Sequence, residues 1–173
     1  MAGASLPLVS LPANELLTVH EDDVPLIRNT LGEGIHYRVL RLDLERGEWL
    51  ILLTFEPGTK THLHYHTGPS DVYTLQGNWI YMEYPDQPQI KGSYLYEPGG
   101  STHTFEAPAD NTEDTVIMVR VTGSNINFNE DGSFDSIFDA VAIRDQVDRA
   151  ASEQGLGDVR YVGGGDAGFT AEG

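Results

Sequence analysis

Three histidines, His64, His66 and His103, are the residues of this chain whose type and spacing point most directly to chemistry. His64 and His66 are two positions apart, and residues i and i+2 of a β-strand face the same side. Both imidazoles can therefore reach one metal ion, and imidazole binds most first-row divalent metals. His103 comes directly after the glycine-rich turn segment 98–102 and supplies a third imidazole. We expect these three side chains to form a metal centre.

The segments that must position these histidines have the pattern of short β-strands. Alternation of apolar and polar residues predicts strands at residues 35–44 and 48–55, joined by the turn Glu45-Arg46-Gly47. Glycine and proline separate further predicted strands at residues 61–66, 71–75, 79–84, 92–97, 103–107 and 115–122. Many short strands with turn residues between them predict an all-β sandwich or barrel.

A single helix is predicted after the strands, with Ser136 as its N-terminal cap and Gly155 as its stop. Its apolar positions recur with helical spacing, and they are Ala140, Ile143, Val147, Ala150 and Ala151. Residues 157–173 are rich in glycine, and we expect them to be a mobile tail without an ordered element. Residues 1–156 are expected to form one domain, which includes N-terminal strands and this helix.

Composition excludes several classes of protein. With 173 residues and 39% hydrophobic content, the chain has the size of one domain with a real core. Ten basic against 27 acidic residues give a net charge of −17, which repels nucleic acid and anionic membranes. No apolar run approaches the ~20 residues of a membrane span, so we expect a cytoplasmic protein without a nucleic-acid or membrane partner. Because the chain has no cysteine, a metal must be bound by histidine, carboxylate or carbonyl groups.

Two motifs resemble those of the cupin superfamily. In the first, five residues separate Gly58 from His64-Tyr65-His66, and Gly77 closes the motif; in the second, Gly92 precedes Pro98-Gly99-Gly100 and His103. The amino-acid sequence around both motifs is similar to that of the cupin dioxygenases that cleave 2,4'-dihydroxyacetophenone. The resemblance covers roughly residues 45 to 140. It implies a cupin jelly-roll barrel, a double-stranded β-helix, with the metal inside its mouth and a C-terminal helix beside it.

The chain departs from the common cupin pattern at Ser70. Most cupins place a glutamate ligand there, seven residues before the closing glycine. The neighbouring Asp71 should face the opposite side of the strand, unless a bulge after Gly68-Pro69 turns it inward. We therefore predict a three-histidine site. The similar C–C-cleaving dioxygenases, including the one that acts on acetylacetone, also use three histidines and no carboxylate.

Three neutral imidazoles leave a divalent iron its full charge and three open positions in six-coordinate geometry. Such a centre suits an enolisable ketone bound through two oxygens, with the third position left for dioxygen. We therefore predict a non-haem Fe(II) dioxygenase, an oxidoreductase whose partners are a small-molecule ketone and dioxygen. The resemblance implies an aryl hydroxyketone that gives an aryl carboxylate and formate, or a β-diketone.

The resemblance also gives Glu97 a role. It stands six residues before His103, where similar dioxygenases hold a glutamate outside the ligand shell that orients a histidine or accepts the substrate's proton. The alternative is a solvated carboxylate at a strand end. His62 falls outside the motif spacing and is expected outside the ligand set. Four residues are candidates for an aromatic-accepting pocket, with the core as their alternative: Trp79, Tyr81, Phe105 and Met118.

Two other functions compete with the dioxygenase. One is a non-catalytic zinc-binding cupin such as the sensor domain of anti-sigma factors, but those domains keep the carboxylate that is Ser70 here. The other is a cupin isomerase or decarboxylase with manganese or nickel, since three imidazoles bind each of these metals. We further expect self-association into a homodimer or homotetramer, because a sheet-rich domain of this size has edge strands to cover.

Overall fold

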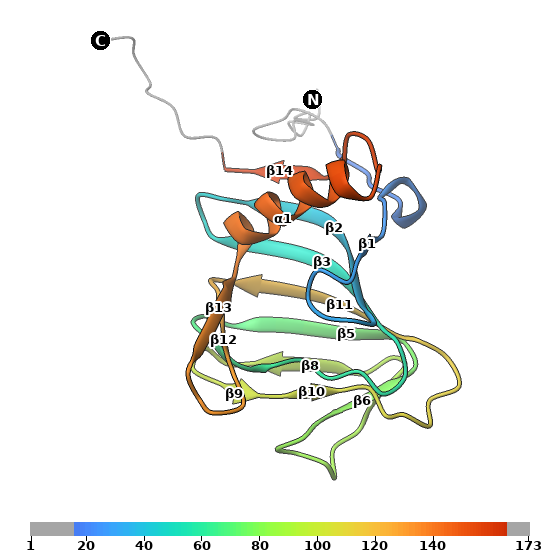
Figure 1. Ribbon diagram of the computed structural model, residues 1–173, viewed down its shortest axis with the longest axis vertical. Coiled ribbons are helices and arrows are strands. Elements are labelled where there is room, and N and C mark those ends of the chain that lie inside the picture. Colours follow the sequence, from blue (N-terminus) through green and yellow to red (C-terminus); the bar gives the residue numbers. More distant parts are fainter. Residues whose placement is uncertain (1–15, 166–173) are drawn as a thin grey trace, which may run out of the picture.

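The computed structural model describes residues 16–165, and β-strands in three sheets dominate it (Figure 1). The largest sheet has seven strands, and six of them follow one path in the order β1 (Ile27–Arg28), β2 (Ile35–Asp43), β3 (Glu48–Phe55), β11 (Thr115–Thr122), β5 (Ser70–Gln76) and β8 (Tyr94–Glu97). The seventh, β14 (Val162–Gly164), pairs in parallel with β2. A short 3₁₀ turn, η1 (Glu21–Asp23), precedes the sheet.

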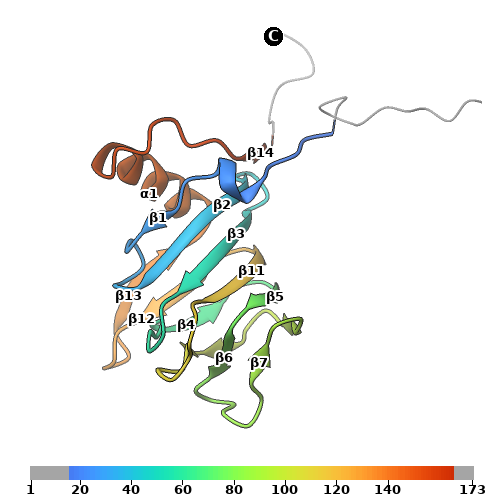
Figure 2. The ribbon, with the colours of Figure 1, turned by 90° about the vertical axis from the view of Figure 1, so that its right-hand side faces the viewer.

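Two smaller sheets complete the structure. One has the order β13 (Phe134–Phe138), β12 (Asn125–Phe128), β4 (Leu63–His66) and β9 (Thr102–His103). The other has the order β10 (Phe105–Glu106), β6 (Asn78–Tyr81) and β7 (Gln89–Ile90). Figure 2 shows β12 and β13 behind the large sheet, and β6 and β7 at the end away from the helix. The expected all-β architecture is confirmed.

The core lies on the inner face of the large sheet because apolar residues alternate along its strands. In β11, for example, Ile117, Val119 and Val121 are buried, whereas Met118 points outward. Phe138, at the end of β13, packs edge-on against Trp49 at a ring distance of 5.2 Å. This aromatic contact joins the sheet that carries the histidines to the large sheet.

The helix α1 (Ala140–Glu153) buries Ala140, Ile143, Val147 and Ala150 and contacts β1, β2 and β13. Its predicted stop is confirmed, since Gly155 has a φ of +65° and the N–H of Leu156 donates back to the carbonyl of Ala151.

The predicted helix cap is wrong. Asp139 caps the helix, and its carboxylate accepts the backbone N–H of Ala142 at 2.9 Å. Ser136 instead lies within β13, opposite Asn127 of β12. Pairing between these strands keeps Ser136 extended, so the helix begins only after β13 ends.

The expectation of a tail without ordered elements is wrong for residues 162–164, which form β14 beside β2. A side chain at Gly164 would place its Cβ 2.9 Å from Asp43, and one at Gly165 would place it 2.6 Å from a carboxylate oxygen of Asp43. The glycines therefore let this segment lie against the buried Asp43. Residues 166–173 of the expected tail lie outside the described residues.

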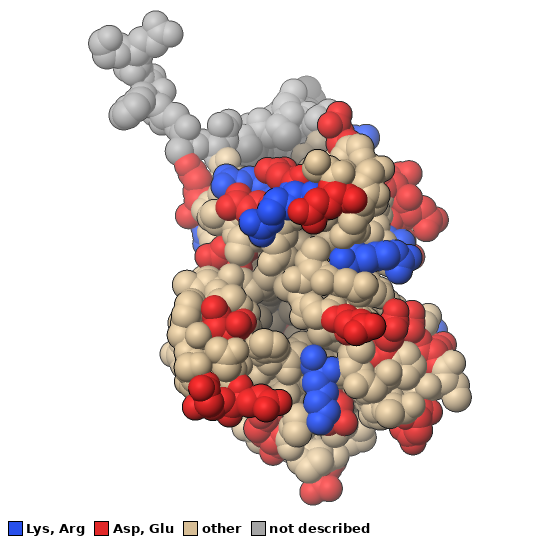
Figure 3. Space-filling view, in the orientation of Figure 1, with Lys and Arg blue, Asp and Glu red and all other residues tan. Residues whose placement is uncertain are grey.

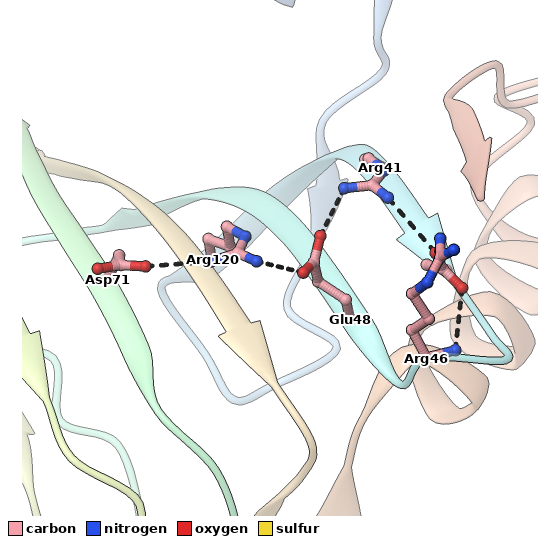
Figure 4. A network of polar contacts seen from close by, with 6 residues as sticks. Arg41, Arg46, Glu48, Asp71 and Arg120 are labelled. Atoms are coloured by element: carbon pink, nitrogen blue, oxygen red, sulfur yellow. Dashed lines mark hydrogen bonds and ion pairs between the residues drawn. The ribbon is translucent and has the colours of Figure 1, made fainter. Parts of the chain in front are cut away.

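An ion-pair network crosses the outer face of the large sheet (Figure 4). Its members, in order, are Arg46, Asp43, Arg41, Glu48, Arg120 and Asp71. The network links β2, β3, β11 and β5 on the face opposite the core. Within residues 16–165, no helix is long and apolar enough to cross a membrane.

Candidate metal centre

The structure brings the three predicted histidines together. His64 and His66 come from β4 and His103 from β9, and the antiparallel register sets His64 directly opposite His103. One ring nitrogen from each histidine lies within 4.8 Å of the others. The Nε2 atoms of His66 and His103 are only 3.1 Å apart, and all three side chains are buried.

The protonation state of these imidazoles suits metal binding, as does their geometry. Burial lowers the pKa of all three, to about 3 for His66 and about 2 for His103, so each ring is neutral at pH 7. The Nδ1–H of His64 donates to the carbonyl oxygen of His62 at 3.0 Å, which leaves the Nε2 lone pair for a metal. Three neutral nitrogens converging in a buried space are a suitable donor set for a divalent ion.

Glu97 lies beside two of these histidines. Its Oε2 is 3.3 Å from Nε2 of His66, and its Oε1 is 3.6 Å from Nε2 of His103. The side chain is 4% exposed, so the alternative of a solvated strand-end carboxylate is wrong. Burial raises the pKa of Glu97, and a hydrogen bond from the Tyr81 hydroxyl acts in the opposite direction.

Tyr81 connects Glu97 with the histidines. Its hydroxyl donates to Oε1 of Glu97, and its ring stacks on the imidazole of His103 at a centroid distance of 3.8 Å. From the sequence we considered Tyr81 only as a pocket or core residue. Its i, i+2 spacing from the buried Trp79 indicates an inward direction, but its contacts with Glu97 and His103 depend on strands distant in sequence.

The position where most cupins hold a glutamate ligand is a fully buried serine that faces inward. Ser70 lies directly opposite Glu97 across the β5–β8 pair. Asp71 points outward, as predicted, and its carboxylate accepts from Tyr94 at 2.6 Å and pairs with Arg120 at 3.3 Å. The only carboxylate that the described residues bring beside the histidine nitrogens thus comes from β8 rather than β5.

A cavity of about 330 Å³ extends from His64 and His66 between the large sheet and the strands β12 and β13. The space-filling view shows a hollow between these elements, with acidic residues nearby (Figure 3). Its apolar wall consists of Leu31, Ile35, Trp49, Leu53, Phe55, Val72, Phe105, Ile117, Val119, Ile137 and Phe138. Its polar lining includes Glu97, Asp135, Asn125, Asn127 and Gln146, and no lysine or arginine of the described chain lines it.

The four pocket candidates divide between the cavity and other places. Tyr81 and Phe105 line the cavity, whereas Trp79 is buried behind Phe105 and Met118 lies on the outer sheet face. His62 lies at the cavity wall with a half-exposed side chain, 3.5 Å from Asp135, and belongs to no ligand cluster. His36 is buried away from the site and contacts Glu56 at 3.2 Å.

The barrel and its histidine centre define this protein as a cupin. Its residues 14–125 match the family model of the ChrR cupin-like domain, and the chain belongs to this family. A protein of unknown function with a cupin-like fold from Ralstonia eutropha JMP134 is 39% identical, and the alignment covers 91% of this chain and 97% of that one with a TM-score of 0.84.

Two further solved structures share the fold. An RmlC-like cupin from the same organism is 24% identical, with 85% and 92% coverage and a TM-score of 0.76. An acetylacetone dioxygenase from Acinetobacter johnsonii is 15% identical, with 85% and 99% coverage and a TM-score of 0.67. At these identities the likeness concerns the fold alone. No curated protein matches the chain.

Proposed function

We propose that this protein is a non-haem Fe(II) dioxygenase that cleaves a C–C bond of an uncharged, enolisable ketone. The observation that carries the proposal is the group of three buried, neutral histidines beside a buried glutamate, with serine at the usual carboxylate position. His64, His66 and His103 would hold the iron. When bound, the iron supplies Lewis acidity toward the ketone oxygens and the capacity to activate dioxygen.

Glu97 is the base in this proposal. Forming an enolate from a ketone requires removal of a proton, and Glu97 lies next to the histidine nitrogens that define the centre. Burial raises the pKa of Glu97, which makes its carboxylate a stronger base than a solvated one. Tyr81 holds one carboxylate oxygen and leaves the other for the substrate's proton.

The lining of the cavity supports an uncharged substrate with an apolar part. Glu97 and Asp135 line the cavity but no arginine or lysine of the described chain does, so the lining offers no cationic side chain to pair with the carboxylate of a keto acid or with a phosphate. About 330 Å³ with a mostly apolar wall suits a ring-sized group. Aryl hydroxyketones and β-diketones meet both conditions.

One observation favours a second candidate, a non-catalytic zinc site. The carboxylate of Glu97 is 3.3 Å from the nearest histidine nitrogen, so a small movement would add a fourth ligand, and structural zinc sites are closed by four protein ligands. Such a site would leave no position for a ketone. The two candidates therefore differ in what Glu97 does.

The test is anaerobic reconstitution with Fe(II), followed by measurements of oxygen uptake with a panel of hydroxyketones, diketones and carboxylated analogues. We expect uptake only with uncharged ketones, and loss of iron in His64→Ala, His66→Ala and His103→Ala. An absence of oxygen uptake together with anaerobic conversion of a ketone would instead indicate an isomerase or decarboxylase.

The variant Glu97→Gln distinguishes a role of Glu97 as a base from a role as a metal ligand. The amide keeps the size of the side chain but cannot take a proton, so we expect unchanged iron content and a turnover about 10²-fold lower. Glu113→Gln, an exposed glutamate on a loop, is the control and should behave as wild type. Loss of metal in Glu97→Gln would favour the four-ligand zinc site, and normal turnover would exclude Glu97 as the base.

A further inference from the structure

Among the buried polar atoms that have no hydrogen-bond partner within residues 16–165, two beside the metal centre belong to directly opposed residues. They are Nδ1 of His66 and Oδ1 of Asn125. Strand β12 pairs antiparallel with β4, which sets Asn125 opposite His66 and Asn127 opposite His64. Directly opposed side chains lie on the same face of a sheet with Cβ atoms about 4.5–5.5 Å apart. The two atoms therefore belong to neighbouring side chains.

The chemistry of the two atoms is complementary. If Nε2 of His66 binds a metal, the neutral ring carries its proton on Nδ1, which becomes a hydrogen-bond donor. The amide oxygen of Asn125 is an acceptor. His64 meets the same requirement through the carbonyl of His62, at 3.0 Å, whereas no acceptor of the described chain forms a hydrogen bond with Nδ1 of His66 in this structure.

The order of the strands favours a hydrogen bond between His66 and Asn125. Strands β9 and β12 lie on opposite sides of β4, and Nε2 of His66 approaches His103 of β9 at 3.1 Å. Asn125, on the other side, is therefore placed to contact the remaining nitrogen of the ring.

We propose that Asn125 is a positioning residue whose amide oxygen accepts the Nδ1–H of His66 in the metal-loaded protein. This hydrogen bond would select the tautomer of His66 and hold its Nε2 toward the metal. The inference rests on the metal centre of the proposed function and not on the dioxygenase reaction.

Asn127 provides a matched comparison on the same strand. Its amide donates to the hydroxyl of Ser136 at 3.0 Å, and the histidine opposite it, His64, already has a partner for Nδ1. Asn127 therefore shares the residue type, strand and face of Asn125 but is not needed to orient a histidine.

The experiment uses the full chain loaded with Zn²⁺, which is diamagnetic. Zinc affinity is measured by competition with a chelator, and the Nδ1–H signals of the histidines are recorded by ¹⁵N-resolved NMR. For Asn125→Ala we expect an affinity about 10- to 100-fold lower and loss of the His66 Nδ1–H signal. Asn125→Asp keeps an acceptor and should retain the signal, and Asn127→Ala should change neither quantity.

Three results would overturn the inference. The first is an Asn125→Ala protein with zinc affinity within twofold of wild type and a persistent His66 Nδ1–H signal. The second, which applies even if the variant does not fold, is a wild-type zinc protein without a through-space contact between that proton and the Asn125 side chain. The third, a wild type that does not bind zinc through its histidines, would overturn the metal centre itself and is thereby distinguished from the first two.

Discussion

The reactivity of the centre depends on which side chains near it carry charge. Its three histidines are neutral because burial lowers their pKa, so the charge there would come from a bound metal ion and from Glu97. Because position 70 is a serine rather than a glutamate, it adds no second carboxylate beside Glu97. Because Ser70 is fully buried and opposite Glu97, a substitution there acts directly on the site.

Ser70→Glu should convert the three-histidine site into one with a fourth protein ligand. We expect the variant to retain metal but to lose most oxygen uptake, since the added carboxylate lowers the charge at the metal and occupies an open position. Metal analysis and an oxygen electrode provide the two measurements. Asp71→Glu, one position along on the outer face, is the control. Near-normal uptake by Ser70→Glu would show that position 70 does not reach the metal.

At the scale of elements, the site depends on a pair of short strands in which isoleucine and phenylalanine are mixed with asparagine, aspartate and serine. Strands β12 and β13 pair with each other, and β12 also pairs with β4, which carries two of the histidines. Phe138 and the helix α1 fasten β13 to the large sheet. The helix therefore stabilises the wall of the cavity as well as its own end of the barrel.

Asp139→Ala should destabilise the protein by about 1 kcal/mol, because it removes the acceptor for an N–H group in the first turn of α1. Urea or thermal unfolding measures the change. Ser136→Ala removes a hydroxyl within β13 but no helix cap, and it should cost less. A larger cost for Ser136→Ala than for Asp139→Ala would mean that the helix begins earlier than the structure shows.

For the molecule as a whole, the ion-pair network on the outer sheet face makes stability depend on pH. The backbone N–H of Arg46 donates to Asp43 at 3.0 Å and, together with the Arg46 and Arg41 guanidinium groups, lowers the pKa of the Asp43 carboxyl. A carboxyl whose pKa is lower in the folded state stabilises that state above its unfolded pKa of about 4. This stabilisation is lost as the pH falls through the lower, folded value.

Asp43→Asn should accordingly be less stable than wild type at pH 7, and the difference should shrink as the pH falls below about 4. Thermal unfolding across this range, with Asp86→Asn on an exposed loop as the control, measures the difference. A difference between wild type and Asp43→Asn that stays constant from pH 7 to pH 2 would contradict the role of the ionised carboxylate.

Self-association remains a proposal at this scale. Exposed apolar side chains, Tyr73, Tyr94, Tyr96 and Met118, lie on the outer face of the large sheet beside the ion pairs. We expect a homodimer or homotetramer through this face, and Met118→Glu should dissociate it. Sedimentation at micromolar concentration measures the mass, and a single 19.0 kDa species for the wild type would refute the expectation.

The sequence by itself determined the properties that depend on neighbours along the chain. Alternation and turn residues predicted the bounds of β3 and β11 correctly. The cupin motif marked position 70, and the period of two then placed Asp71 on the opposite side of the strand. The spacing of His64 and His66 on one strand face was predictable for the same reason, and the two motifs led to His103. Turn residues and strand alternation are local, so a single sequence contains them.

Only the tertiary structure decided which distant segments meet. The contact of Glu97 with Tyr81 and the histidines joins strands β8, β6, β4 and β9. Strands β12 and β13 were not predicted because they are only four and five residues long and carry asparagine, aspartate and serine among their isoleucines and phenylalanines. Pairing of the two strands with each other and of β12 with β4 decides that they form. Pairing with β12 also keeps Ser136 extended, so Asp139 rather than Ser136 caps the helix. The need for glycine at positions 164 and 165 became visible only from their close approach to the buried Asp43. Pairing and burial of polar residues depend on partners far along the chain, which local patterns do not specify.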